Sequence, residues 1–315
     1  MKIVRFRALA LACASLCLTV FTLRADSIQE DFSVSPETRG WKEFGHTNLF
    51  SWDSTNQNLQ VTWDSSFGNS YFYRPLGTIL TRDDDFSFSF DVHFDEFDAG
   101  SFELAVGFLN FANASSPSFV RGTGPDSPNM AEFDYFPDYT SIDATIADTN
   151  SILQFTYDFS SGLNTGQTYR VTIRHAAGDG LLTGEVRTNG NLYTALPFTY
   201  TQTNFTDFRL DTFSISSYDG TNSFGELYAR GIIDNINLTL PPPPVSTIVG
   251  SFSNESWQVQ FLSRSNWLYT LQRSIDLQSW STVSSVTPGT GSTLVIQETN
   301  SVGGHALYRV SAARP

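Results

Sequence analysis

Two carboxylates placed two residues apart, Glu132 and Asp134, are the side chains of this sequence whose type and spacing could do chemistry. They lie in the stretch Ala131–Tyr139, AEFDYFPDY. In a β-strand both side chains would point to one face, with Cα atoms about 6.6 Å apart. Carboxyl groups so placed could approach the roughly 5–5.5 Å separation of a retaining glycoside hydrolase. They could equally accept hydrogen bonds from sugar hydroxyls and cleave nothing.

Aromatic side chains are the second set of candidate ligand contacts. The chain contains 27 Phe, 12 Tyr and 6 Trp, and aromatic rings can stack on the faces of sugars. We expect Trp52, Trp63 and Tyr73 to contact a glycan, together with Tyr71, and burial in the core is the alternative fate of each ring. The long Gly/Ser/Pro-rich stretch 112–129 precedes the carboxylate pair and is expected to form one wall of a groove.

Charge and residue spacing exclude several other functions. The chain has 18 Lys and Arg against 32 Asp and Glu, a formal net charge of -14, so its surface repels nucleic acid and anionic lipid. The four histidines are scattered and not paired as in a transition-metal site. Neither a G-x-S-x-G elbow nor a Gly-rich phosphate loop occurs. The acidic run Asp83–Asp85 is interpreted as a solvated turn.

The elements that must position these side chains are strands. Phe86–Phe94, FSFSFDVHF, alternates apolar and polar residues with the period of two that is typical of a half-buried strand. Phe102–Phe111, FELAVGFLNF, is more uniformly apolar, and Tyr169–His175 alternates again. Gly178–Gly180 and Asn189–Gly190 supply turns between strands. Because no segment shows helical periodicity over three turns, we predict an all-β fold, a jelly-roll β-sandwich.

A run of four prolines divides the chain. The segment Leu240–Ser246, LPPPPVS, favours an extended polyproline II spacer. We therefore predict a large β-sandwich domain at residues 26–240, a Pro-rich linker at 241–246 and a small β-sandwich at 247–315.

The first 25 residues have the pattern of a signal peptide. Three basic residues precede the apolar run Ala8–Leu23, and Ala25 offers a cleavage position. An uncleaved anchor is the alternative. Both cysteines lie within this segment, so packing or metal and not disulfides must stabilise the mature chain. We predict a protein that is secreted or displayed at the cell surface, with no membrane span after signal removal.

The large part resembles the concanavalin A-like lectin/glucanase superfamily over most of residues 28–240. The resemblance lies in Glu30–Ser33 (EDFS), Leu163–Ile173 (LNTGQTYRVTI) and Arg230–Leu240 (RGIIDNINLTL). It implies a sandwich whose first and last strands pair at an edge. It also implies a calcium ion held between those strands, and the matching residues are Asp31 and Asp234. Ordinary strand-end acids that cap turns are the alternative for this pair.

The small part resembles a fibronectin-III-like module common at the C-terminus of exported bacterial proteins. The matching segments are Leu268–Trp280 and Ala306–Ala312. The resemblance implies an accessory or envelope-attachment role for residues 247–315. This part contains Trp257, Trp267 and Trp280. We interpret them as core anchors, and an exposed platform for sugars is the alternative.

The resemblance also tests the carboxylate pair. Laminarinase-like glycoside hydrolases of the superfamily carry E-x-D-x-E or E-x-D-x-x-E on the strand that faces the sugar cleft. Glu132 and Asp134 match the first two positions, but Phe136 and Pro137 stand where the third acid would be. Asp138 would lie about 20 Å from Glu132 on extended chain. The site therefore lacks its proton donor, which favours holding a glycan over breaking it.

The sequence thus predicts a secreted, lectin-like protein that binds a polysaccharide or glycan without catalysis through Glu132, Asp134 and the aromatic residues. One alternative is a retaining glycoside hydrolase of laminarinase-like type that acts on a β-glucan or related polysaccharide with Glu132 and Asp134 as its catalytic pair. The other alternative is a structural protein of the cell surface or matrix that has no ligand.

Overall fold

The computed structural model describes residues 26–98, 102–121, 127–178, 180–196, 198–201, 203–220, 226–253, 256–298 and 306–315. These residues form almost only strands and turns, which confirms the all-β prediction. The predicted signal peptide, residues 1–25, lies outside the described residues. None of the described helices is long and apolar enough to cross a lipid bilayer.

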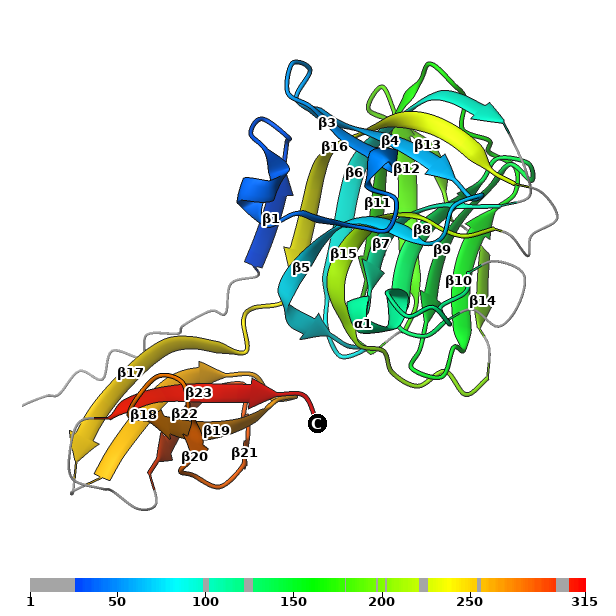
Figure 1. Ribbon diagram of the computed structural model, residues 1–315. Coiled ribbons are helices and arrows are strands. Elements are labelled where there is room, and N and C mark those ends of the chain that lie inside the picture. The colour runs from blue at the N-terminus through cyan, green and yellow to red at the C-terminus, as the bar shows by residue number, and fades with distance from the viewer. Residues whose placement is uncertain are drawn as a thin grey trace, which may run out of the picture.

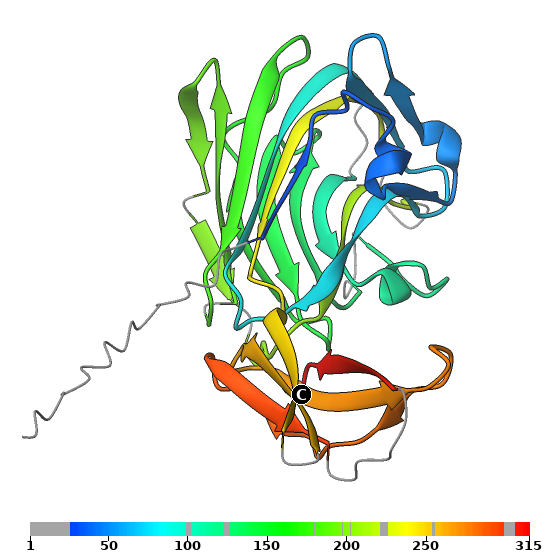
Figure 2. The same ribbon diagram turned by 90° about the vertical axis from the view of Figure 1, so that its left-hand side faces the viewer.

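The large domain is a sandwich of two antiparallel sheets (Figures 1 and 2). The strands of the first sheet are β1 (Asp26–Glu30), β3 (Phe50–Asp53), β4 (Asn58–Asp64), β6 (Phe86–Asp98), β11 (Thr168–His175), β12 (Leu182–Thr188), β13 (Asn191–Ala195) and β16 (Tyr228–Leu240). Their order is β13-β12-β11-β6-β16-β4-β3, and β1 pairs with β16. This sheet contains both ends of the domain.

The second sheet carries the predicted carboxylates. Its strands are β2 (Lys42–Phe44), β5 (Ser70–Leu80), β7 (Leu104–Leu109), β8 (Met130–Phe136), β9 (Ser141–Ala147), β10 (Leu153–Asp158), β14 (Phe198–Thr201) and β15 (Leu210–Ser217). Their order is β14-β10-β9-β8-β7-β15-β5-β2. Together the two sheets form the predicted jelly-roll β-sandwich, with the core of the domain between them.

The first and last strands of the large domain pair, as the resemblance implies. Glu30 lies opposite Ile236 and Asp26 opposite Leu240. The first half of β16 pairs instead with β4, up to Ile233 opposite Leu59. β1 therefore takes over from β4 as the neighbour of β16, and β16 runs through the interior of the sheet with β6 on its other side.

Alternation along the strands decides which side chains enter the core. In β6 every second residue from Phe86 to Phe94 is buried, as the period-two pattern predicts. β7 differs, because all six of its residues are buried. Both faces of β7 are therefore covered, one by the first sheet and the other by the segment that follows the strand. That segment begins with the short helix α1 (Phe111–Ala114), whose N-cap Asn110 accepts a hydrogen bond from the backbone N–H of Asn113. The two 3-10 helices, η1 (Pro36–Arg39) and η2 (Thr47–Leu49), are equally short.

The small domain consists of two small antiparallel sheets. The strands of the first are β17 (Val245–Ser253), β18 (Ser256–Ser263) and β22 (Thr293–Gln297), and those of the second are β19 (Leu268–Ser274), β20 (Ser281–Thr282), β21 (Thr287–Pro288) and β23 (Leu307–Ala313). Trp267 is buried in the core of this domain, as predicted. Trp257 and Trp280 are half-buried, and the guanidinium of Arg309 lies 4.2 Å from the ring centre of Trp280.

A buried ionic cluster joins the two domains. The prolines 241–244 connect β16 to β17, and both Arg264 and Arg314 donate hydrogen bonds to the carboxylate of Asp84. The carboxylate of Asp84 is fully buried. Interpreting Asp83–Asp85 as a solvated turn was therefore wrong for Asp84, because two arginines from a distant part of the chain cover its carboxylate. The small domain is fixed to the large one by paired charges.

Candidate functional site

The predicted carboxylates lie side by side on the outer face of the second sheet. In β8 the side chains of Phe133 and Tyr135 enter the core, so Glu132 and Asp134 point away from the first sheet. Glu132 lies between Gly107 of β7 and Thr145 of β9. The strand alternation therefore places the pair on one face, as expected.

A guanidinium group occupies the space where a ligand would reach these carboxylates. Nη2 of Arg121 lies 3.0 Å from the carboxylate of Glu103 and 3.2 Å from that of Asp134, and its Nε lies 3.3 Å from Glu132. Tyr218 donates a 2.5 Å hydrogen bond from its hydroxyl to Glu132. Burial, and then the negative charge of Glu132, raise the pKa of Tyr218 well above its ordinary value, so the hydroxyl remains a donor.

This carboxylate cluster, which we define as Glu103, Glu132, Asp134 and Arg121, is closed to solvent. The four side chains are at most 2% exposed. Glu103 supplies the third carboxyl group that β8 lacks. Glu103 directly precedes β7, whereas the E-x-D-x-E motif would place its third acid on β8. In this arrangement neither Glu132 nor Asp134 is in contact with solvent, and the pair holds the loop that carries Arg121 against the sheet.

The segment that was predicted to form the wall of a groove instead covers the carboxylates. This segment is residues 112–129, and its described part, residues 112–121 and 127–129, lies on the outer face of the sheet. Residues 122–126 lie outside the described part of the chain. Phe119 and Arg121 of this segment are buried. Asn129 closes the segment on the sheet, since its side-chain oxygen accepts a 2.8 Å hydrogen bond from the backbone N–H of Arg209.

Asp143 borders the cluster on the next strand. It lies directly opposite Asp134 in the β8–β9 pair and is only partly buried. Burial, and then the charge of Asp134, raise the pKa of Asp143 to about 7, although Ser141 opposes this by donating a 2.5 Å hydrogen bond. Because its pKa is raised, this carboxyl group keeps its proton to a higher pH than an ordinary aspartate, and in that form it can both donate and accept hydrogen bonds.

Beyond Asp143 the same outer face carries exposed aromatic rings at the sheet edge. We define this aromatic stripe as Phe155, Tyr157, Phe159 and Tyr200. Tyr157 lies opposite Asp143, and Phe155 lies opposite both Thr145 and Tyr200. The Phe155 and Tyr200 rings are stacked with centres 4.8 Å apart. The ring of Tyr157 lies 5.4 Å from that of Phe155 and 4.5 Å from that of Phe159.

The stripe is accessible to a ligand, in contrast to the cluster. The side chains of Phe159 and Tyr200 are 58% and 44% exposed, and those of Phe155 and Tyr157 are half-buried. Sequence reasoning overlooked it, although a signal was present. Three aromatic residues recur with a period of two in FTYDF, which is the pattern of one face of a strand.

The aromatic residues expected to bind a glycan lie apart from the carboxylates. Trp63 is buried in the core, with its ring 5.9 Å from that of Phe94, so a sugar cannot stack on it. Trp52 is half-buried and donates a 2.9 Å hydrogen bond from its indole nitrogen to the carbonyl of Phe32. Tyr71 is also buried, and its hydroxyl donates to the carbonyl of Ala114 at 3.0 Å.

Tyr73 lines a hollow of the surface. It occupies the same row of side chains as Glu132, but β15 and β7 lie between. Three strand spacings separate the two residues by about 14 Å. Its ring stacks on that of Phe111 at 4.2 Å.

The predicted calcium ligands are engaged by other groups. The carboxylate of Asp31 accepts hydrogen bonds from Arg39 at 2.8 Å and from Ser33 at 2.7 Å. Asp234 accepts a 2.6 Å hydrogen bond from the backbone N–H of Asn235. Burial, and then the charges of Asp91 and Asp31, raise the pKa of Asp234.

The surroundings of Asp234 do not fit a calcium ion. The carboxylate of Asp91 and the carbonyl of Asn235 both accept hydrogen bonds from Arg170, at 3.1 and 2.7 Å. Two arginines thus occupy oxygens that calcium would need. Among the described residues, no three histidine, cysteine or acidic side chains gather as a metal site. Calcium binding remains an untested prediction.

Comparison with known proteins gives structural similarities only. No protein-family model and no curated protein matches the sequence. Among solved structures, the chain is similar to winged bean acidic lectin complexed with methyl-alpha-D-galactose (13% identity, TM-score 0.42, 69% of this chain and 99% of the lectin). It is also similar to a mutant of the alginate lyase Aly36B in complex with alginate trisaccharide (12%, 0.38, 69% and 98%) and to the carbohydrate binding module CBM66 from Bacillus subtilis (11%, 0.36, 64% and 95%). Likenesses this distant assign neither a ligand nor an activity to this chain.

Proposed function

We propose that this protein is a carbohydrate-binding protein whose large domain holds a neutral polysaccharide across the aromatic stripe. The observation that carries the proposal is the row of four contacting rings, two exposed and two half-buried, on one face of a sheet edge. Sugar rings present apolar faces that stack on aromatic side chains, while their hydroxyls need hydrogen-bonding partners. Asp143, directly beside Tyr157, supplies such a partner.

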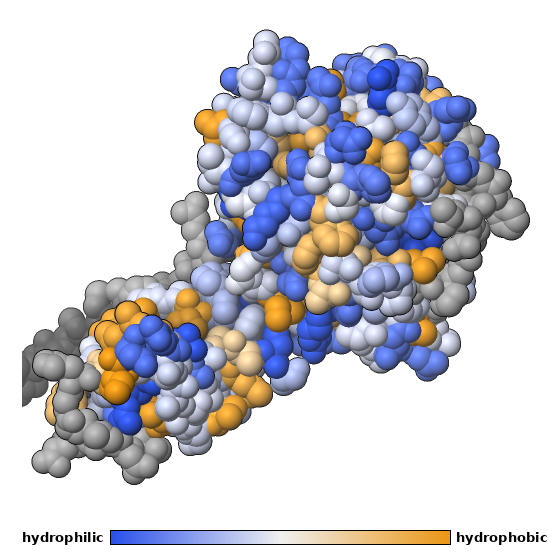
Figure 3. All heavy atoms as spheres, in the orientation of Figure 1, coloured by the Kyte–Doolittle hydropathy of each residue, from blue (hydrophilic) through white to orange (hydrophobic). Residues whose placement is uncertain are grey.

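Charge favours a neutral ligand. The chain has a formal net charge of -14, so an anionic polysaccharide would approach against repulsion. The surface shown in Figure 3 is mostly hydrophilic over the large domain, while apolar residues are concentrated on the small domain and near the junction.

We further propose that binding occurs without cleavage and outside the cell. Burial of Glu132 and Asp134 under Arg121 supports the first part, because catalytic carboxylates must reach the bond that they break. The basic residues and apolar run of residues 1–25 support the second part, since they have the pattern of an export signal.

Affinity electrophoresis in soluble β-glucan, xylan, mannan and alginate would test the proposal. We expect retardation by at least one neutral polymer and none by alginate. Tyr200→Ala and Phe159→Ala should each weaken binding roughly fivefold to tenfold, because one stacked ring contributes about 1 kcal/mol. Tyr228→Ala is the matched control, since this tyrosine is 36% exposed on the other sheet.

Two results would overturn the proposal. Binding of no neutral polymer, or equal binding by wild type and both stripe variants, would remove the stripe as a glycan site. Release of reducing ends from any of these polymers by the purified protein would instead contradict the non-catalytic part.

A further inference from the structure

The rings of the aromatic stripe do not lie in one plane. The planes of Phe155 and Tyr157 meet at 36°, and those of Tyr157 and Phe159 meet at 56°. Phe155 and Tyr200 are closer to parallel, at 28°, but with centres 4.8 Å apart they stack on each other. The aromatic stripe therefore offers no flat platform on which several coplanar sugar rings could rest at once.

The two ends of the aromatic stripe are its most exposed parts. Phe159 directly follows β10 and Tyr200 lies on β14, and we call these two the end rings. Phe155 covers one face of Tyr200. Because β14 is the outermost strand in the order of its sheet (Figure 1), the other face of Tyr200 is turned toward the open edge. A sugar can stack on either end ring, whereas the two inner rings are half-buried.

The end rings are too far apart for one sugar to contact both. Tyr200 lies directly opposite Phe155 on the neighbouring strand, and Phe159 follows Phe155 by four residues. Strand geometry therefore separates the backbone at Tyr200 from that at Phe159 by about 14 Å. The two sugars of a disaccharide are adjacent and cannot stack on both end rings, but a chain of several sugars can.

A hydrogen-bonding group lies beside the middle of the aromatic stripe. Asp143 of β9 is directly opposite Tyr157, and its carboxyl group can pair with hydroxyls along the edge of a glycan chain. In a crystalline polysaccharide these edge hydroxyls are already bonded to neighbouring chains of the same layer. A separate, hydrated chain therefore offers both a face for each end ring and edge hydroxyls for Asp143.

We propose that the aromatic stripe recognises a single hydrated glycan chain of several sugars through its two end rings, and does not bind the surface of a crystalline polysaccharide. This inference rests on the proposed function and specifies its ligand. A chain whose successive sugars turn relative to one another can follow rings tilted by 36° and 56°, whereas the flat face of a crystal cannot. Because both end rings bind the same chain, the second contact is intramolecular, and affinity rises once the chain is long enough to reach both.

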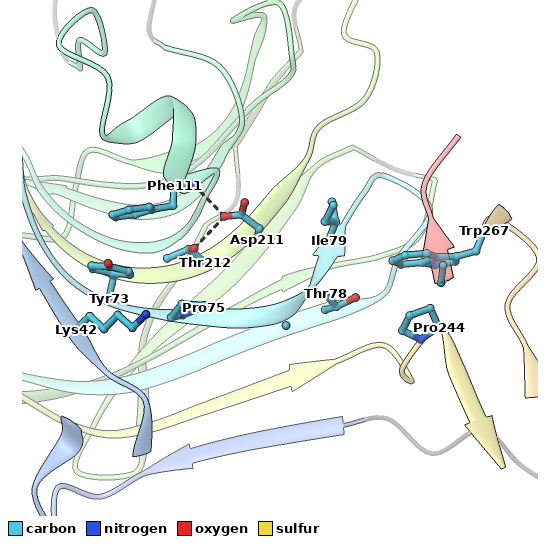
Figure 4. A pocket seen from close by; sticks show the side chains of 12 residues that line it. Lys42, Tyr73, Pro75, Thr78, Ile79, Phe111, Asp211, Thr212, Pro244 and Trp267 are labelled. Carbon is cyan, nitrogen blue, oxygen red and sulfur yellow. Dashed lines mark hydrogen bonds between the residues drawn. The ribbon is translucent and has the colours of Figure 1, made fainter. Parts of the chain in front are cut away.

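Isothermal titration with oligosaccharides of two to six sugars from the cello, laminari, xylo and manno series tests the chain-length requirement. In at least one series we expect the hexasaccharide to bind fivefold or more tightly than the disaccharide. Tyr200→Ala and Phe159→Ala should each lower the hexasaccharide affinity fivefold or more, because either variant leaves one end ring. Tyr73→Ala is the control, since this ring stacks on Phe111 near the opposite edge of the same sheet (Figure 4). Circular dichroism checks the fold of each variant.

Sedimentation with insoluble polysaccharides tests the second part of the inference. The whole protein is mixed with microcrystalline cellulose, crystalline chitin or crystalline mannan, and each solid is removed by centrifugation. We expect the protein to remain in the supernatant, because a flat crystal face cannot contact both end rings. Amorphous cellulose, made by swelling the same microcrystalline material, provides the matched solid whose chains are separate and hydrated.

The outcomes separate this inference from the proposed function. If a soluble polymer retards the protein through Tyr200 and Phe159, but disaccharide and hexasaccharide bind equally, the proposed function stands and the inference about the end rings is wrong. Sedimentation of the wild type with a crystalline solid, lost in both Tyr200→Ala and Phe159→Ala, would also overturn the inference alone. Retardation by no soluble neutral polymer would overturn the proposed function and this inference together.

Discussion

The two buried ionic clusters of this protein are opposite in their composition. In the carboxylate cluster one arginine, Arg121, faces three acids. At the junction one acid, Asp84, faces two arginines. Removal of charges from water costs several kcal/mol for each ion and is offset only by close pairing. Both clusters therefore fix geometry. The carboxylate cluster holds a loop on a sheet, and the ionic cluster at the junction holds one domain against the other.

The difference between them lies in the distance along the chain. The members of the carboxylate cluster all lie between residues 103 and 134. At the junction, Arg264 and Arg314 lie 180 and 230 residues after Asp84. The first cluster resembles a catalytic motif in the sequence and the second resembles a solvated turn, but both are closed inside the protein. Acid spacing alone thus does not separate an active site from a structural ion pair.

The largest effect is expected from Arg121→Met, which leaves three buried carboxylates without their arginine. The free energy of unfolding should fall by about 3–5 kcal/mol, measured by urea denaturation. Arg187→Met is the control, because the side chain of Arg187 is 41% exposed in its pair with Glu185. A loss below about 1 kcal/mol for Arg121→Met would mean that the cluster does not hold the loop.

Asp84→Asn should have the next largest effect. It leaves Arg264 and Arg314 without a counter-charge, and the expected loss is about 3 kcal/mol, since Arg264 at 10% exposure retains some access to water. Small-angle scattering should show a larger maximum dimension as the domains separate. Asp83→Asn changes the exposed neighbour and should alter neither quantity. An unchanged scattering curve for Asp84→Asn would show that other contacts hold the domains.

Asp143→Asn should change how stability depends on pH. The pKa of Asp143 is about 7 in the folded protein, whereas the ordinary pKa of an aspartate is 3.8. The folded state therefore keeps a proton that the unfolded state loses as pH rises above 3.8, and the stability contributed by this group falls until about pH 7. Relative to that of the wild type, the free energy of unfolding of Asp143→Asn should rise by about 2 kcal/mol between pH 5 and pH 8. Urea denaturation at the two pH values measures this change. If the difference in stability between variant and wild type is the same at both, the pKa of Asp143 is not raised.

Glu96→Gln provides the exposed reference for both clusters. Nε of Arg230 lies 2.7 Å from Glu96, closer than most pairs in the carboxylate cluster, yet these side chains are 54% and 46% exposed. Solvent screening should limit the loss to less than about 1 kcal/mol. A loss as large as that of Arg121→Met would show that distance, and not burial, decides the strength of ion pairs in this protein.

Several features follow from the sequence alone. The alternation in Phe86–Phe94 predicts a strand and the face that enters the core, because the two faces of a strand have a period of two. The proline run lies between the domains, since proline has no N–H for a sheet ladder. The sequence also shows that β8 lacks a third acid, which set the expectation of binding without cleavage.

The tertiary structure decided which faces are open. Period-two patterns place Glu132 and Asp134 on one face of β8, but they do not say that residues 112–121 cross that face or that Arg121 pairs with both acids. Likewise, Asp84 lies far in sequence from Arg264 and Arg314, which cover its carboxylate. Local periodicity depends on backbone geometry within one strand, whereas burial depends on segments that meet only when the chain has folded.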